Sequence, residues 1–332
     1  MSNRTNFYIN GEWVAPSTSD TIDVINPATE QSIGQVAMGG AADVDKAVAA
    51  AKAAFATFSQ TSREERISIL EAVIAKYSER MGDVAAAISE EMGAPVNLAN
   101  KAQAPAGLGH LMTTLGVLKE FEFEEDLGTS RIIREPAGVC GFITPWNWPI
   151  NQIACKVAPA LAAGCTMVLK PSEIAPFNAI LFAEVMDAAG VPAGVFNLVN
   201  GDGPTVGAAL SSHPDVDMMS FTGSTRAGIE VARNAAPTIK RVAQELGGKS
   251  ANIILDDADL TIAAKGAARA AFTNSGQVCL CGSRILIDSK IYEDFMPLFI
   301  NEVQAMKTGN PVEQDTDIGS VISLEHMEKV LS

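Results

Sequence analysis

The segment from residue 138 to residue 246 alternates short apolar runs with helical patterns, and this rhythm constrains the fold more than any other feature. The predicted strands cover residues 139–143, 166–170, 195–199, 218–221 and 241–246. The predicted helices between them cover residues 153–163, 179–189, 205–210 and 225–234. Short apolar strands that alternate with helices are typical of a parallel sheet covered on both faces. The sequence therefore predicts a doubly wound α/β domain over residues 138–247, with its ligand at the carboxyl ends of the strands.

Residues 1–120 are predicted to form strands and helices that pack on this domain. Asn10-Gly11 lies between two β-rich runs, which is a strong hairpin signal, and further strands are expected up to residue 36. An Ala-rich helix is expected over residues 42–57. Ser62 and Glu65 fit a capping box for a helix running to about Arg80, with another helix ending near Gly93. Residues 96–120 are also predicted to be helical, with an interruption at Pro105.

Two further segments complete the predicted organisation. Residues 121–137 form either a hairpin or an arm that reaches across a subunit boundary. Residues 248–332 read as the start of a second α/β unit, because a helix over 261–274 and an amphipathic helix over 292–306 flank one strand over 284–287. A helical pattern over 323–332 has no C-terminal cap. This second domain is expected to be incomplete.

Composition narrows the class of protein. A length of 332 residues favours about two domains. The net charge of −15 argues against nucleic acid or an anionic membrane as a partner. No run of about 18 apolar residues predicts a membrane span. Residues 1–6 lack an apolar signal core, so a cytoplasmic location is expected.

The five cysteines are interpreted as free thiols, because they are sparse, odd in number and in a chain without a secretion signal. Cys140, Cys155 and Cys165 lie in apolar or Ala/Gly surroundings. Cys279-Leu280-Cys281 is a poor zinc signal, because no second pair of ligands follows at a suitable spacing. No metal site is predicted.

Three residues carry the clearest chemical signal. Cys279 lies on a loop flanked by Gly276 and Gly282, Glu245 precedes Gly247-Gly248, and Asn147 lies between two tryptophans. A nucleophile, a base and an oxyanion donor are what acyl chemistry through a thioester requires. Each residue also has an ordinary structural explanation, as a buried small side chain, a surface acid or a turn residue. The three together are harder to explain in that way.

Residues at the predicted strand ends suggest a dinucleotide site. Gly223 stands between a strand and a helix, where backbone N–H groups can approach a pyrophosphate, although Ser224 could equally be a plain helix cap. At a neighbouring strand end, Lys170 and Glu173 could hold ribose hydroxyls, or could form a solvated turn. Glu173 would repel a 2′-phosphate, which favours NAD over NADP.

With these stretches taken together, the chain resembles the NAD(P)-dependent aldehyde dehydrogenase superfamily over its whole length. The matching stretches are Thr144-Pro145-Trp146-Asn147-Trp148-Pro149, Lys170-Pro171-Ser172-Glu173, Phe221-Thr222-Gly223-Ser224-Thr225, Glu245-Leu246-Gly247-Gly248-Lys249 and Gly276-Gln277-Val278-Cys279. The resemblance implies a Rossmann-type parallel sheet domain and a second α/β catalytic domain. Because family members are longer, this chain is expected to be truncated at its C-terminus. The full-length form is expected to be a homodimer or homotetramer.

The resemblance also implies a mechanism. Cys279 would attack an aldehyde carbonyl, while the Asn147 amide and the Cys279 backbone N–H stabilise the oxyanion. Hydride would pass to C4 of the nicotinamide, and Glu245 would activate the water that hydrolyses the thioester.

Further residues are assigned by the same resemblance. The implied cofactor contacts are Thr144, Pro145, Trp146, Lys170, Ser172, Glu173, Gly203, Gly223, Ser224 and Leu246. The implied substrate contacts are Trp148, Asn151, Gln152, Cys155, Val278 and Leu280. Because Asn151 and Gln152 are polar, a small or polar aldehyde, such as a semialdehyde, is expected. Two alternatives stay open: a non-catalytic fragment that at most binds NAD, and a cofactor-independent hydrolase using Cys279 and Glu245.

Overall fold

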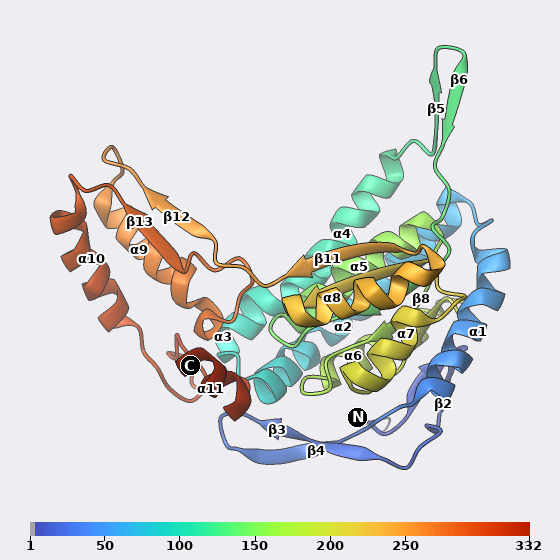
Figure 1. The fold of residues 1–332 in the computed structure, drawn as a ribbon, viewed down its shortest axis with the longest axis horizontal. Coiled ribbons are helices and arrows are strands. Elements are labelled where there is room, and N and C mark those ends of the chain that lie inside the picture. Colours follow the sequence, from blue (N-terminus) through green and yellow to red (C-terminus); the bar gives the residue numbers. More distant parts are fainter. Residues whose placement is uncertain (1–3) are drawn as a thin grey trace.

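A mixed seven-stranded sheet forms the centre of the computed structural model, which describes residues 4–332 (Figure 1). Its strand order is β11-β10-β7-β8-β9-β1-β2. These strands are β1 (Phe7–Ile9), β2 (Glu12–Val14), β7 (Val139–Ile143), β8 (Thr166–Lys170), β9 (Phe196–Leu198), β10 (Met218–Gly223) and β11 (Arg241–Leu246). Strands β7 to β11 pair in parallel, which confirms the predicted doubly wound domain. The N-terminal hairpin extends the same sheet in an antiparallel sense, because Tyr8 pairs with Leu198.

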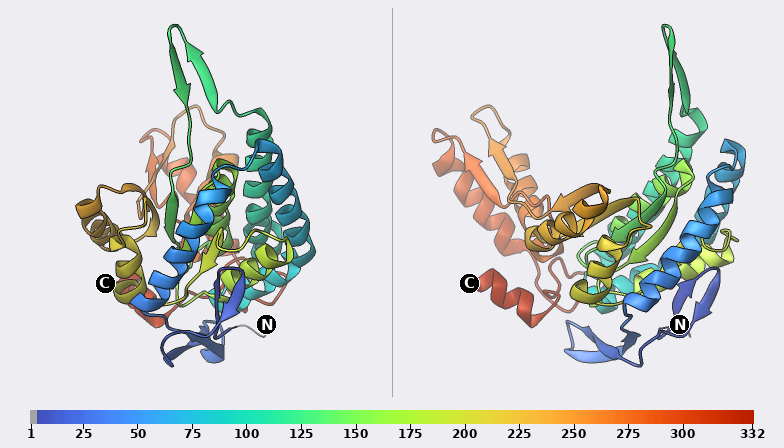
Figure 2. Two further views of the ribbon diagram at one scale, coloured as in Figure 1. Left: turned by 90° about the vertical axis from the view of Figure 1, so that its right-hand side faces the viewer. Right: turned by 45° about the vertical axis from the view of Figure 1, so that its right-hand side comes forward.

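Helices cover both faces of this sheet, and each layer has its own buried core (Figures 1 and 2). One layer is α1 (Ala41–Phe58), α7 (Ala208–Ser212) and α8 (Thr225–Ala235), with a π-helical turn η2 (Gly203–Gly207) before α7. The other layer is α2 (Arg63–Met92), α4 (Ala104–Glu120), α5 (Pro149–Ala163) and α6 (Phe177–Ala188). A short 3-10 turn, η3 (Ala236–Thr238), follows α8. Strands β7 and β8 are buried along their whole length between these layers, which explains their continuous apolar sequence.

Helix α2 corrects one prediction, because it is a single helix where two were expected. Its N-terminus has the predicted capping box: Ser62 Oγ accepts from the Glu65 N–H at 3.2 Å, and Glu65 Oε2 accepts from the Ser62 N–H at 2.7 Å. The helix continues through Gly82 to Gly93, whose φ of 79° ends it. Burial of Ile88 and its neighbours in the core outweighs the weak helix propensity of one glycine.

The segment that follows is helical, as predicted, but it is interrupted just before Pro105. It consists of α3 (Val96–Leu98), a π-helical turn η1 (Ala99–Gln103) and then α4. Pro105 occupies the first turn of α4, where its missing N–H costs no hydrogen bond.

The predicted hairpin over residues 121–137 is present as β5 (Glu124–Leu127) and β6 (Ser130–Ile133). It projects from the body of the molecule, and every residue of both strands is exposed (Figures 1 and 2). The first strand begins later than expected, because Phe121 and Phe123 pack against each other at the base of the arm, with ring centroids 4.9 Å apart.

The last part of the chain forms a separate small α/β unit. Its strands are β12 (Ala251–Ile254) and β13 (Arg284–Ile287), which pair in parallel across α9 (Leu260–Phe272). The remaining elements are a 3-10 turn η4 (Thr273–Gly276), α10 (Tyr292–Ala305), which packs on α9, and α11 (Leu324–Leu331), whose His326 lies against Trp146 of the turn after β7. Strand β12 was not predicted; its four residues are a weak strand signal until β13 lies beside them.

Two remaining strands, β3 (Thr21–Asn26) and β4 (Gln31–Ala37), lie where further strands were expected, and they pair with each other in an antiparallel sense. None of the helices in residues 4–332 is long and apolar enough to cross a membrane. The division into domains at residues 120, 137 and 247 stays a prediction, and residues 1–3 of the first domain lie outside the described part of the chain.

Candidate active site

The parallel register brings three predicted site segments to one edge of the sheet. Ile143 at the end of β7 pairs with Phe221 of β10 and with Lys170 of β8, and Thr222 of β10 pairs with Glu245 of β11. The turn that holds Asn147, the Lys170 turn and Glu245 therefore leave the sheet at the same edge. This is where an open α/β sheet binds its ligand.

Asn147 is held against the cysteine loop by two hydrogen bonds. Its Nδ2 donates to the Gln277 carbonyl at 2.9 Å, and its own carbonyl accepts from Asn274 Nδ2 at 3.0 Å. A side-chain amide nitrogen carries two hydrogens, so one N–H fixes the plane of the Asn147 amide and the second can meet a substrate oxygen. Asn147 is thereby anchored two residues before Cys279 along the loop.

The cysteine loop packs between α9 and the glycines that follow β11. Cys279 is half-buried and carries a free thiol. A Cβ placed on Gly248 would lie 3.5 Å from the Cys279 carbonyl oxygen, so the chain at Gly248 runs directly beside Cys279. Cys281 is buried, and its thiol donates to the Gly276 carbonyl at 3.3 Å. This hydrogen bond from Cys281 therefore joins the two ends of the cysteine loop.

Glu245 is exposed at the end of β11 and lies near two side chains of α5. Lys156 is buried, and its Nζ donates to Ser220 Oγ at 3.1 Å. Burial lowers the pKa of Lys156, while the nearby charge of Glu245 acts in the opposite direction. Burial raises the pKa of Cys155, and Glu245 adds to that rise. No hydrogen bond joins Glu245 to Cys279 within residues 4–332.

The predicted cofactor residues lie along the same edge. The Thr144 N–H donates to the Lys170 carbonyl at 3.1 Å, and Lys170 Nζ, which is buried, lies 2.9 Å from Glu173 Oε2. Ser172, between them in sequence, is buried. Pro145 is half-buried and follows directly in the β7 turn.

The remaining predicted cofactor residues lie at or near this edge. Gly223 ends β10, and Ser224 caps α8 by accepting from the Ala227 N–H at 3.3 Å. Leu246 ends β11 opposite Gly223. Gly203 opens η2 and is exposed. Trp146 stacks edge-on against His326, with ring centroids 4.9 Å apart.

The predicted substrate residues divide into two groups. Trp148, Val278 and Leu280 line one cavity of about 340 Å³ beside the cysteine loop. Asn151, Gln152 and Cys155 lie instead on the first turns of α5 and are not part of that cavity lining. Asn151 Oδ1 lies 2.8 Å from His110 Nε2 of α4, a contact that the sequence did not suggest.

A model of the aldehyde dehydrogenase family matches residues 13–332. The chain belongs to the aldehyde dehydrogenase family. One relative, a 3-succinoylsemialdehyde-pyridine dehydrogenase from a Pseudomonas species, is 55% identical over 331 residues, which are 99% of this chain and 69% of that protein.

Solved structures of the family agree closely with this fold. Aldehyde dehydrogenase C of Pseudomonas syringae, solved as a mutant in complex with NAD+ and octanal, is 47% identical with a TM-score of 0.97. The match covers 99% of this chain and 68% of that one. A betaine aldehyde dehydrogenase of Staphylococcus aureus, solved in complex with NAD+, is 37% identical with a TM-score of 0.95, over 99% of this chain and 67% of that one. The α/β fold inferred from the sequence is confirmed.

A buried amide network, which was not expected from the sequence, lies behind the cysteine loop of this aldehyde dehydrogenase. Gln103 Nε2 donates to Asn274 Oδ1 at 3.0 Å, Gln277 Nε2 donates to the Asn274 carbonyl at 3.0 Å, and the Ile322 N–H donates to Gln277 Oε1 at 3.0 Å. Asn274 has a φ of 57°, in the left-handed region that asparagine tolerates better than most residues. The run Thr273-Asn274-Ser275-Gly276 was the available signal, since it is typical of a turn.

Proposed function

We propose that this chain oxidises an aldehyde to a carboxylic acid and reduces NAD, through a thiohemiacetal and a thioester on Cys279. The observation that carries the proposal is the 2.9 Å hydrogen bond from Asn147 to the Gln277 carbonyl. It fixes an amide N–H donor beside the loop that presents the thiol. A fixed donor stabilises an oxyanion without reorganising during the reaction.

The residues at the sheet edge fit NAD. Glycines at 203 and 223 leave room for a backbone to approach a phosphate, and the N-terminus of α8 offers unpaired N–H groups. Several buried polar atoms near this edge have no partner within the described residues, namely Thr144 Oγ1, Thr222 Oγ1 and both amide atoms of Asn200. The Lys170–Glu173 pair would hold the adenosine ribose, and Glu173 disfavours a 2′-phosphate. The family relatives solved with NAD+ support the same cofactor.

The chemistry then follows from the chain's own groups. The Cys279 thiolate forms a bond to the carbonyl carbon, and the carbonyl oxygen becomes an oxyanion held by the Asn147 amide and the Cys279 N–H. NAD, when bound, accepts the hydride that leaves this carbon. Glu245 takes a proton from water, which attacks the resulting thioester; the carbon–sulfur bond breaks, the acid leaves and the thiolate is restored.

The test is NADH formation, followed by absorbance, with NAD and a panel of short aldehydes. The parent should produce NADH, and Cys279→Ala should produce none. Asn147→Ala should lower kcat by about 10²–10³-fold, the usual loss when one oxyanion donor is removed. The rate at which iodoacetamide alkylates Cys279 is the control, because it should change little in Asn147→Ala if the loop stays folded.

Other outcomes separate the alternatives. NAD binding without turnover would favour the non-catalytic reading, and ester cleavage without NAD would favour a hydrolase. Assembly into a homodimer or homotetramer and a cytoplasmic location stay predictions.

A further inference from the structure

The cavity beside the cysteine loop contains one side chain that carries a full charge at neutral pH. Its lining residues are Trp148, Gly266, Arg269, Ala270, Thr273, Val278, Leu280 and Cys281. All except Arg269 are apolar or uncharged at neutral pH, and no carboxylate is among them. A guanidinium stays charged at any pH the enzyme meets, so the cavity carries a permanent positive charge.

The backbone of Arg269 lies beside the loop that carries Cys279. It lies in the last turn of α9, and the loop packs on this same turn: the Gly282 N–H donates to the Ala270 carbonyl at 3.2 Å, and the Cys281 thiol to the Ala271 carbonyl at 3.6 Å. Thr273 Oγ1 donates to the Arg269 carbonyl at 2.6 Å. The backbone that carries the guanidinium is therefore tied to the loop that carries Cys279.

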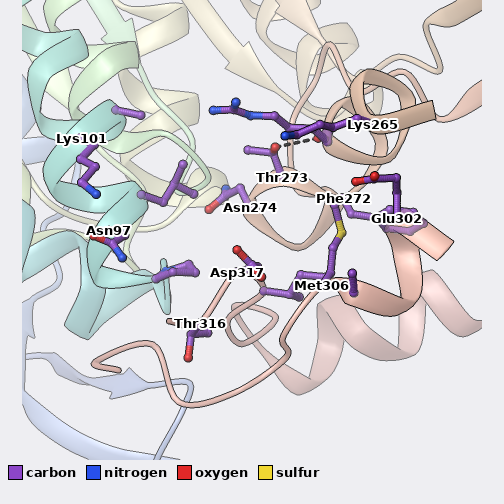
Figure 3. Close-up of a pocket in the computed structure, with 16 residues that line it drawn as sticks. Asn97, Lys101, Lys265, Phe272, Thr273, Asn274, Glu302, Met306, Thr316 and Asp317 are labelled. Atoms are coloured by element: carbon purple, nitrogen blue, oxygen red, sulfur yellow. Dashed lines mark hydrogen bonds between the residues drawn. The ribbon is translucent and has the colours of Figure 1, made fainter. Parts of the chain in front are cut away.

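The positive charge extends beyond this cavity. Arg269 and Thr273 also line a larger cavity of about 480 Å³, whose wall includes Lys101 and Lys265 (Figure 3). Figure 3 shows these two lysines reaching the cavity from different elements. None of the three cations forms an ion pair in the described part of the chain. Two acids, Glu302 and Asp317, line the larger cavity but not the smaller one.

This clustering is informative because the chain as a whole carries a net charge of −15. Of the three cations, only Arg269 lines the smaller cavity, where no carboxylate offsets its charge, so its guanidinium is the group that can meet an anion there. An arginine in the last turn of a helix also stabilises the helix dipole, but that effect would not depend on the substrate.

We propose that Arg269 selects aldehydes that carry a carboxylate at the end opposite the aldehyde group. The guanidinium would bind the carboxylate through two parallel hydrogen bonds while the carbonyl lies at Cys279. The inference rests on the proposed function and adds its substrate class. The apolar side chains of Trp148, Val278 and Leu280 would enclose the short carbon chain between the two ends.

The experiment compares succinic semialdehyde with butanal, which has the same carbon number and no carboxylate. For Arg269→Gln, kcat/KM for the semialdehyde should fall about tenfold or more, mainly through KM, because a charge-assisted hydrogen-bonded contact is lost. Its kcat/KM for butanal should change less than about twofold. Arg269→Lys should keep part of the preference for the semialdehyde over butanal, because lysine retains the positive charge but lacks the planar set of N–H donors that matches a carboxylate.

Lys265→Gln is the matched control, because it removes the same charge one turn earlier on α9 and lines only the larger cavity. Three results would overturn the inference. In Arg269→Gln, kcat/KM could fall equally for the semialdehyde and for butanal, or fall for neither. In Lys265→Gln, kcat/KM could show the same selective fall for the semialdehyde. If the parent oxidises no aldehyde, the proposed function fails, and calorimetry still tests Arg269. Succinate should then bind the parent more tightly than butyramide and lose this advantage in Arg269→Gln; equal binding of the two would overturn the inference.

Discussion

At the scale of single residues, the candidate site depends on amides more than on charges. Asn147 Nδ2 donates to the backbone carbonyl of Gln277, and Asn274 Nδ2 donates to the backbone carbonyl of Asn147. Asn274 and Gln103 are almost completely buried. Buried amides that satisfy one another define a single arrangement, because any other arrangement leaves polar groups without partners.

Replacing Asn274 should therefore be costly. In Asn274→Ala, the Asn147 carbonyl loses a partner and Gln103 Nε2 keeps only a long contact to Met92 Sδ, and leaving a buried polar group unsatisfied costs about 1–3 kcal/mol. We expect the free energy of unfolding, measured in urea, to fall by at least about 2 kcal/mol. Asn100→Ala is the control, because Asn100 is exposed, and it should change stability by less than about 0.5 kcal/mol. Equal losses in the two variants would contradict a special role for the network.

Lys156 gives a prediction about pH. Burial lowers its pKa in the folded protein below the ordinary value of 10.5. Between the lowered pKa and 10.5, the unfolded chain binds more protons than the folded one, so this group makes the free energy of unfolding rise with pH. Below that window, the cost of burying the charge is fully present.

The measurement is urea denaturation of the parent and of Lys156→Met at about pH 7 and about pH 10. Subtracting the variant removes the contribution of other titrating groups, except the nearby Glu245 and Cys155, which interact with Lys156. The parent should gain stability relative to the variant at the higher pH. A constant difference would show that Lys156 has an ordinary pKa.

At the scale of elements, helix α2 shows how two glycines in one helix can have opposite roles. Gly93 ends the helix at a φ of 79°, and a Cβ there would lie 2.8 Å from Pro27 Cγ and 3.1 Å from Ser320 Cβ. Gly82 lies mid-helix, and a Cβ there would meet nothing within 4 Å. Gly93 is followed by Pro95, a local signal for a helix end, but only the structure shows that the helix runs on through Gly82.

Alanine substitutions at the two positions should therefore have opposite effects. Gly93→Ala should lower the free energy of unfolding by about 1–2 kcal/mol or more, because the left-handed conformation is strained for alanine. Gly82→Ala should raise it by about 0.5–1 kcal/mol, because alanine is the better helix former. Thermal denaturation followed by circular dichroism would compare them, and shifts of the same sign would disprove this assignment of roles.

At the scale of the whole molecule, the edge of the sheet should behave as one cofactor site. NAD that binds only the folded state at about 100 times its Kd should add about 2.7 kcal/mol to the free energy of unfolding. We expect NAD to raise Tm more than NADP does at equal concentration, because Glu173 repels a 2′-phosphate. In Glu173→Gln, the difference between the rise in Tm with NAD and the rise in Tm with NADP should become smaller. A parent that is stabilised equally by NAD and NADP would refute the role of Glu173.

Some features of the fold depend only on residues that are close together in the chain, and these could be predicted from the sequence. Alternating apolar strands, the Ser62–Glu65 capping box and the Asn10-Gly11 turn were sufficient for the central fold, because strand burial, helix capping and tight turns depend on neighbours within a few residues. Five short motifs resemble those of the aldehyde dehydrogenase family and indicated that family. The family model that matches residues 13–332 then showed it.

Other features required contacts between segments far apart in the chain. Strand β12 exists because β13 lies beside it, and the N-terminal hairpin joins the central sheet through a single pairing with β9. The amide network links Gln103 to Asn274, and Arg269 matters because its helix turn packs on the cysteine loop. The sequence by itself predicted most of the helices and strands and proposed the reactive residues, since these depend on local propensity and side-chain chemistry. Only the tertiary structure decided which polar groups are buried together and which charged side chain lines the cavity beside the cysteine loop, because burial and electrostatic potential arise from the packing of the whole chain.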